Sequence, residues 1–140
     1  MTPLAETFNM FVQLKETAMR RPEIHVLVVE NQYLIAMEVE RILVENLDCR
    51  VNICACEKLE EELAETAYDV VIIDAAPSQD LNRSRARHVA STGAAIVFLS
   101  SYVEPAEDPA VVEGAMILTK PLDADLLPRT ILAALGARND

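Results

Sequence analysis

Short apolar runs alternate with helical patterns along the chain from residue 24 onward. Apolar runs that are continuous are typical of strands buried on both faces of a parallel sheet. We expect such strands at residues 25–30, 50–55, 70–74, 94–99 and 116–119. Strands that alternate with helices indicate stacked βαβ units. The pattern therefore predicts an α/β fold with a five-stranded parallel sheet.

Apolar residues recur at helical spacing between the predicted strands. In residues 35–47 they form one helical face, while Glu38 and Arg41 fall towards the other. The members of this apolar face are Ile35, Val39, Ile42, Leu43 and Leu47. Further helices are expected at residues 58–66, 81–91 and 110–114. A last helix, whose regular part starts near Pro128, should end at Gly136 as its C-cap.

Residues 1–22 differ in character from the rest of the chain. Thr2 can cap a helix that opens with Pro3, and an apolar stripe follows at helical spacing. The stripe consists of Leu4, Phe8, Phe11 and Val12. An isolated helix of this length is marginal in water unless it buries such a stripe. We therefore expect an N-terminal helical extension at residues 1–22, which packs on the domain at residues 23–140 or serves for docking or for a homodimer.

Composition limits both the architecture and the partners. A chain of 140 residues with 51% apolar residues supports one domain with one sizeable core. Twelve basic and 23 acidic residues give a net charge of -11, which opposes binding to nucleic acids or to an anionic membrane. No apolar run approaches the roughly 20 residues that cross a bilayer, and no secretory signal begins the chain. We therefore expect a cytoplasmic protein whose partner is a protein or a small ligand.

Polar residues stand at the ends of four of the predicted strands. In an open parallel sheet, ligands bind beyond the carboxyl ends of the strands, where the strand order reverses. These ends carry Glu30 with Asn31, Asp74, Ser100 and Lys120. Each residue alone is more often a solvated strand end, a helix cap or part of a turn. Their joint placement, however, brings carboxylates, a hydroxyl and an ammonium group to one edge of the sheet.

This set of groups suits a divalent cation beside a phosphoryl group. Glu30 and Asp74 offer carboxylate oxygens, and magnesium accepts one or two carboxylates while it keeps several waters. A carboxylate can attack phosphorus to form an aspartyl phosphate if cations offset the charge of the incoming group. Lys120 and the metal would offset it, and Ser100 can donate a hydrogen bond to a phosphoryl oxygen. The strand ends therefore predict phosphoryl chemistry on a carboxylate.

Four stretches of the sequence resemble successive blocks of response-regulator receiver domains. They are VLVVENQYLIAMEVERIL, DVVIID, AAIVFLSSY and ILTKPLDADLL, and the match covers roughly residues 24–137. The resemblance implies a flavodoxin-like (βα)5 fold, doubly wound, with strand order 2-1-3-4-5. It also implies that Asp74 accepts phosphate from a phosphohistidine, that Ser100 senses the phosphate and that Lys120 contacts it.

The resemblance implies a magnesium site as well. Glu30, Asp74 and the backbone carbonyl of Ala76 would hold the metal, and the peptide bond before Pro121 would be cis. Asn31 stands where the family usually has a second acid, so it would contact the metal weakly or through water. We therefore expect weak magnesium binding.

Three interpretations of the function stay open. The leading one is a stand-alone receiver that takes phosphate from a histidine kinase or a histidine phosphotransfer protein and signals by binding a further, unknown protein. The first alternative is a pseudo-receiver that keeps the fold but is not switched by phosphate. Asn31 favours it, as does the altered loop after the acceptor, where Pro77 comes one residue early. A further departure from the family is Ile117, which stands in place of an aromatic switch residue. The second is a small flavodoxin-like enzyme, which we do not expect because the chain has only three glycines and no glycine-rich phosphate loop.

Overall fold

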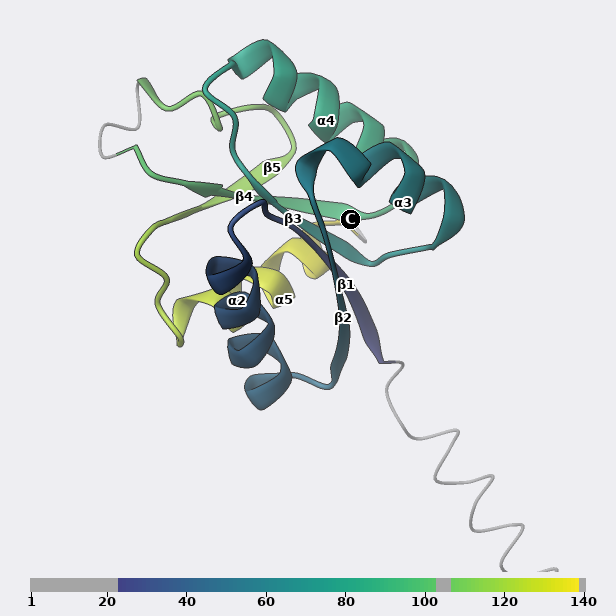
Figure 1. Cartoon of the computed structure of the whole chain (residues 1–140), viewed down its shortest axis with the longest axis vertical. Coiled ribbons are helices and arrows are strands. Elements are labelled where there is room, and N and C mark those ends of the chain that lie inside the picture. Colours follow the sequence, from purple (N-terminus) through teal and green to yellow (C-terminus); the bar gives the residue numbers. More distant parts are fainter. Residues whose placement is uncertain (1–22, 103–106, 139–140) are drawn as a thin grey trace, which may run out of the picture.

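Five parallel strands form one sheet in the order β2-β1-β3-β4-β5 (Figure 1). The computed structural model describes residues 23–102 and 107–138. The strands are β1 Ile24–Val29, β2 Cys49–Cys54, β3 Val70–Asp74, β4 Ala95–Ser100 and β5 Ala115–Thr119. The predicted strands and the predicted sheet order are confirmed, and the strand order reverses between β1 and β3.

Helices cover both faces of this sheet. They are α2 Tyr33–Asn46, α3 Leu59–Glu65, α4 Gln79–Ser91 and α5 Leu126–Arg138, and a short 3₁₀ helix, Cys56–Lys58, precedes α3. α2 and α5 lie on one face, and α3 and α4 lie on the other (Figure 1). The helix expected at residues 1–22 lies outside the described residues. None of the helices in residues 23–102 and 107–138 is long and apolar enough to cross a membrane.

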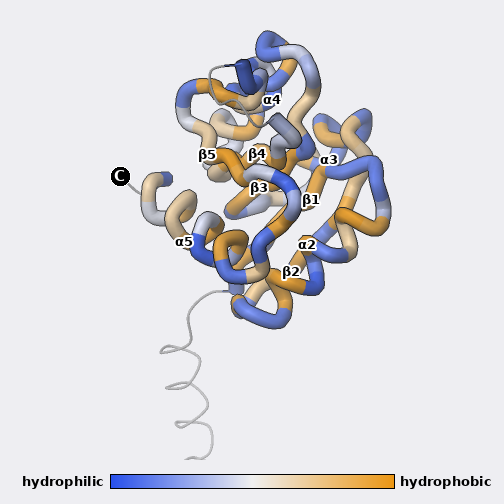
Figure 2. The backbone as a smooth tube through the Cα atoms, turned by 90° about the vertical axis from the view of Figure 1, so that its left-hand side faces the viewer, coloured by the Kyte–Doolittle hydropathy of each residue, from blue (hydrophilic) through white to orange (hydrophobic). Residues whose placement is uncertain are grey.

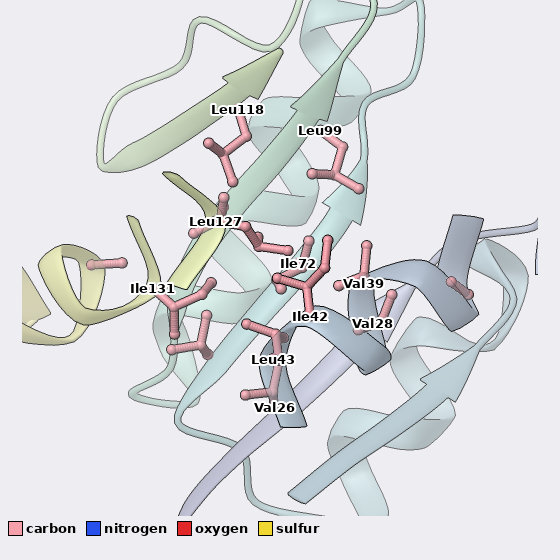
Figure 3. Close-up of a cluster of buried hydrophobic side chains, with 14 residues drawn as sticks. Val26, Val28, Val39, Ile42, Leu43, Ile72, Leu99, Leu118, Leu127 and Ile131 are labelled. Carbon is pink, nitrogen blue, oxygen red and sulfur yellow. The ribbon is translucent and has the colours of Figure 1, made fainter. Parts of the chain in front are cut away.

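The core consists of two apolar layers, one on each face of the sheet. Val26 and Val28 of β1 belong to the layer under α2 and α5, whereas Leu27 and Val29 belong to the layer under α3 and α4. Successive side chains of a strand point to opposite faces, so a strand covered on both sides has to be apolar throughout. Figure 2 shows the hydrophobic strands at the centre of the molecule. Ile42 and Leu43 of α2 pack over the first layer (Figure 3).

The connection from β4 to β5 differs from the expectation. A helix was predicted at residues 110–114, but the structure has turns at residues 109–110 and 113–114 and no α-helix between residues 107 and 114. Asp108 is the physical reason, because its own carbonyl accepts a hydrogen bond from Val111 N at 3.1 Å and its Oδ1 accepts one from Ala110 N at 2.9 Å. These bonds close a turn that competes with a helix. Gly114 has a φ of +84°, a left-handed conformation that also ends any helical path before β5.

The C-terminal helix also corrects one expectation. Gly136 was expected to cap α5, but it lies inside the helix, which continues to Arg138. Arg138 Nη1 donates a hydrogen bond to the carbonyl of Asp69 at 2.9 Å, which ties the end of α5 to the start of β3. Pro128 is compatible with the first turn of α5, because the N–H groups of a first turn have no partner within the helix.

Asn82 of α4 is a polar residue within an apolar helix face. Its side chain is 0% exposed. Its Oδ1 accepts a hydrogen bond from Ala76 N, and its Nδ2 donates to the carbonyls of Ala76 and Pro109, each at 2.9 Å. The amide thus joins the loop after β3 to the turns before β5. A buried amide is tolerated here because each of its groups has a partner.

Replacement of this amide by a side chain of similar size tests its role. Asn82→Leu leaves Ala76 N, Ala76 O and Pro109 O without this partner, so we expect the free energy of unfolding to fall by about 3 kcal/mol or more. Urea denaturation measures it. Asn46→Leu is the matched control, since Asn46 is exposed and donates only to a carbonyl of its own helix. Equal effects of the two substitutions would contradict the role of Asn82.

Candidate functional site

The predicted site residues lie together at the carboxyl edge of the sheet. Val29 of β1 pairs with Ile73 of β3, so Glu30 and Asp74 come next at the same level on neighbouring strands. Lys120 follows β5, and its backbone N donates to the carbonyl of Ser100 at 2.8 Å. The parallel register of the strands therefore brings side chains that are far apart in the sequence to one edge.

An ion pair joins Lys120 to Asp74. Lys120 Nζ lies 2.7 Å from Asp74 Oδ1 and 3.6 Å from Glu30 Oε2. Burial lowers the pKa of Lys120, but the hydrogen bond and the charge of Asp74, together with Glu30, outweigh burial and raise that pKa above its ordinary value. The lysine is therefore a fixed positive charge at neutral pH.

Glu30 is a buried carboxylate with incomplete pairing. The residue is 3% exposed, and its Oε1 accepts a hydrogen bond from Gln32 N at 3.0 Å. Oε2 has no hydrogen-bond partner, and it is the one such buried side-chain N or O atom among the described residues. The distance of 3.6 Å between Glu30 Oε2 and Lys120 Nζ exceeds the length of a hydrogen bond, so this contact is electrostatic. An unsatisfied buried carboxylate oxygen is costly and would be stabilised by a cation.

The donor set fits a hydrated hard cation. Glu30 and Asp74 supply the carboxylate oxygens, and magnesium needs only one or two of these. No group of three or more His, Cys, Asp or Glu side chains that could hold a metal occurs in residues 23–102 and 107–138. A cation at this edge would therefore depend on water and on neutral oxygens for its remaining ligands.

The side chain of Asn31 is engaged with the protein itself. Its Oδ1 accepts a hydrogen bond from Cys56 N at 2.8 Å, which links the loop after β1 to the loop after β2. The Cys56 thiol lies at the rim of the site. Burial raises the pKa of this thiol above its ordinary value. The charges of Asp74 and Glu30 raise the pKa further, and the charge of Arg85 opposes the rise. The thiol is therefore protonated at neutral pH.

Two further predicted groups are also engaged within the protein. The carbonyl of Ala76 accepts from Asn82 Nδ2 at 2.9 Å. The hydroxyl of Ser100 donates to Asp108 Oδ2 at 2.6 Å. The structure thus brings Glu30, Asp74 and Lys120 into contact, whereas the two other groups stand at the same edge with their hydrogen bonds already made.

Sequence reasoning missed Asn82 and Asp108. A signal for Asn82 was present, because Asn82, Ala86 and Val89 share the buried face of α4 and a polar residue inside an apolar stripe is unusual. Asp108 precedes Pro109, a pattern that marks a turn but does not identify the partner of the carboxylate. That partner comes from β4, eight residues earlier in the chain, and only the fold brings it into contact.

Comparison with known proteins adds the fold relationship. No protein-family model and no curated protein matches the sequence. Among solved structures, a response regulator receiver protein from Sinorhizobium medicae matches with a TM-score of 0.65 and 20% identity over 84% of this chain and 98% of that one. A response regulator from Thermotoga maritima matches with a TM-score of 0.67 and 20% identity over 81% and 98%. A response regulator receiver domain protein from Clostridium thermocellum gives 0.66 and 22% over 83% and 97%.

The three matched chains are covered almost completely, so the likeness extends over a whole domain. The chain has the fold of a response-regulator receiver domain. In this receiver fold the peptide bond between Lys120 and Pro121 is cis, as the resemblance implied. At identities of 20–22% the likeness concerns the fold.

Removal of the positive charge of Lys120 tests the charge balance at the site. Lys120→Met leaves Glu30 buried without a positive neighbour, so we expect a loss of about 2–4 kcal/mol in the free energy of unfolding at pH 7. Adding Glu30→Gln to this variant should recover part of the loss. Urea denaturation measures both variants.

Lys58→Met is the matched control, since the pair of Lys58 with Glu61 is exposed and should be worth less than about 1 kcal/mol. A loss that is unchanged by Glu30→Gln would show that Lys120 acts through packing and not through the charge of Glu30.

Proposed function

We propose that the chain is a receiver that accepts a phosphoryl group on Asp74 and signals by binding another protein. The observation that carries this proposal is the contact of Lys120 Nζ with Asp74 Oδ1 at 2.7 Å, beside a buried Glu30 oxygen that lacks a partner. An acceptor carboxylate, a fixed cation and a second carboxylate are the groups that phosphoryl transfer to an aspartate needs. The receiver fold supports the same function by analogy.

The transfer assigns a role to each of the three side chains. A carboxylate oxygen of Asp74 attacks the phosphorus of a phosphohistidine, and the bond from phosphorus to the imidazole nitrogen breaks with its electron pair left on that nitrogen. Lys120 moves its hydrogen bond from the carboxylate to a phosphoryl oxygen, where it offsets the added charge. Glu30 does not react and would be the carboxylate that holds a cation.

Magnesium is the cofactor we propose for this site. When it is bound, it supplies the positive charge that lets a dianionic phosphoryl group approach two carboxylates. Glu30 and Asp74 would hold it, with the carbonyl of Ala76 and the side chain of Asn31 contributing directly or through water. Binding should be weak, because Asn31 is neutral and both neutral oxygens already accept hydrogen bonds.

A histidine kinase or a histidine phosphotransfer protein is the proposed phosphodonor. Such a partner needs a surface next to Asp74, and the first turn of α2 offers one. Tyr33 is 68% exposed and Leu34 is 82% exposed, and both come directly after the loop that carries Glu30. Large exposed apolar side chains beside a polar site are typical of protein contacts. The downstream partner is proposed to be a protein as well.

A pseudo-receiver is the second candidate, and specific observations favour it. The oxygens of Asn31 and Ala76 and the proton of Ser100 are all bonded within the protein, so each has to give up or share a bond before it serves a phosphate site. Such a protein would keep the fold and bind its partner without phosphorylation. Direct measurement of phosphorylation separates the two candidates.

We expect acetyl phosphate with magnesium to phosphorylate the wild-type protein and not Asp74→Asn, because the amide is no nucleophile towards phosphorus. Intact-mass spectrometry measures the added group. Asp80→Asn is the matched control, since Asp80 is exposed at the start of α4 and should leave labelling unchanged. Equal labelling of wild type and Asp74→Asn would remove Asp74 as the acceptor, and no labelling of either protein would favour the pseudo-receiver.

Restoring the missing acid tests the magnesium site. Asn31→Asp keeps an acceptor for Cys56 N and adds a negative charge next to Glu30 and Asp74. Charges about 4 Å apart interact by about 4 kcal/mol at an effective dielectric near 20, and desolvation reduces the net gain, so we expect magnesium to bind about ten- to a hundredfold more tightly. The metal-free protein should be less stable, and magnesium should reverse this loss.

Calorimetric titration with magnesium and thermal melts with and without the metal measure both effects of Asn31→Asp. Gln32→Glu is the matched control, since it makes the same change of charge one residue further on, at an exposed position. If Asn31→Asp binds magnesium no better than the control does, residue 31 does not face the metal.

A further inference from the structure

The hydroxyl of Ser100 has a single proton, and it donates this proton in a hydrogen bond to a buried carboxylate. Ser100 is 1% exposed, and its Oγ donates to Asp108 Oδ2 at 2.6 Å while it accepts from Tyr102 N at 3.1 Å. A serine hydroxyl can donate only one hydrogen bond. Ser100 therefore cannot donate to a phosphoryl oxygen on Asp74 while it donates to Asp108.

Asp108 depends on this bond in turn. It is 6% exposed, and no ion pair joins it to a basic side chain within the part of the chain that the structure describes. Its Oδ2 accepts from Ser100, and its Oδ1 accepts from Ala110 N at 2.9 Å. If the Ser100 proton turned elsewhere, Oδ2 would lose its partner in a buried place, which is strongly unfavourable for a carboxylate. Asp108 would then have to move towards water.

The residues that would move with Asp108 form the 108–111 turn. The Asp108 carbonyl accepts from Val111 N at 3.1 Å, and Gln79 Nε2 donates to the Val111 carbonyl at 2.9 Å. Asn82 Nδ2 bonds both the carbonyl in this turn, at Pro109, and the carbonyl of Ala76 in the loop after Asp74. Two routes of hydrogen bonds therefore lead from the edge of the site to the same turn.

We propose that Asp108 is a positioning residue that competes with a phosphoryl group on Asp74 for the hydrogen bond of the Ser100 hydroxyl. When Ser100 donates to the phosphoryl group instead of Asp108, the 108–111 turn is the segment that is displaced. This rests on the proposed function. The side chain of Ile117 has no polar atom, so it cannot form a hydrogen bond that responds to a change at the Ser100 hydroxyl. The buried carboxylate of Asp108 instead converts a change at Ser100 into a displacement of the turn, because the carboxylate cannot stay buried with half of its partners.

The first measurement needs no phosphate. Hydrogen exchange of the Ala110 and Val111 amides reports the opening of the turn. Ser100→Ala removes the donor to Asp108, so these amides should exchange about ten- to a hundredfold faster. Ser100→Thr keeps the hydroxyl and should exchange like wild type, and so should the control Ser101→Ala, whose side chain makes none of these bonds. Asp108→Asn, which loses one acceptor oxygen, provides a second route to the same increase. Unchanged exchange in both Ser100→Ala and Asp108→Asn would overturn the coupling.

The second measurement adds beryllofluoride with magnesium as the phosphoryl mimic. Fluorine NMR reports whether the mimic is bound, independently of the turn. When the mimic is bound to wild type, exchange at Ala110 and Val111 should rise as it does in Ser100→Ala, whereas in Ser100→Ala binding should add nothing further. A bound mimic with an unchanged turn would overturn the competition for the Ser100 proton.

Absence of a bound signal in wild type would remove the proposed phosphorylation and the competition with it. The first measurement would still decide whether Asp108 links Ser100 to the turn. Failure of the coupling and failure of the proposed function therefore give different results.

Discussion

The charge balance at the carboxyl edge of the sheet depends on one ammonium group that lies near two carboxylates. Lys120 contacts Asp74 directly and reaches Glu30 only at 3.6 Å, so the resting site carries more negative than positive charge. Buried charges are tolerated when they are paired, and Glu30 is only partly paired. This excess of negative charge would favour the binding of a further cation. Lys120 at the same time keeps the two carboxylates compatible with a folded protein.

Around this charge cluster, neutral polar groups are satisfied by bonds within the protein. Asn31 is bonded to Cys56, Ala76 to Asn82 and Ser100 to Asp108. Any ligand at the site would replace some of these bonds rather than fill unused capacity. The net energy of binding is then a difference between two sets of hydrogen bonds, each worth on the order of 1 kcal/mol. The same bonds connect the site to the segments that carry Cys56, Asn82 and Asp108.

The receiver fold is preserved here at identities of 20–22%. The core shows why the same fold is compatible with so low a sequence identity. Strands buried on both faces need apolar side chains of suitable volume, and many combinations of Val, Ile and Leu satisfy that need. The polar edge is less tolerant, because its groups have specific partners. A substitution at the polar edge therefore removes a specific partner, whereas a substitution within the two apolar layers has to conserve only volume and apolarity.

The sequence by itself determined the strands, most of the helices and the edge of the sheet where the polar side chains gather. Apolar periodicity is a local property, and the carboxyl ends of parallel strands meet at one edge in any such sheet, so Glu30, Asp74 and Lys120 could be brought together from their positions alone. The weakly marked helix at residues 110–114 could not be judged in this way, because the carboxylate and carbonyl of Asp108 closed a turn there instead. Only the tertiary structure decided that the proton of Ser100 goes to Asp108 and that Asn82 bridges Ala76 and Pro109. Those choices depend on which buried groups find each other, and a hydrogen bond between distant residues leaves no periodic signal along the chain.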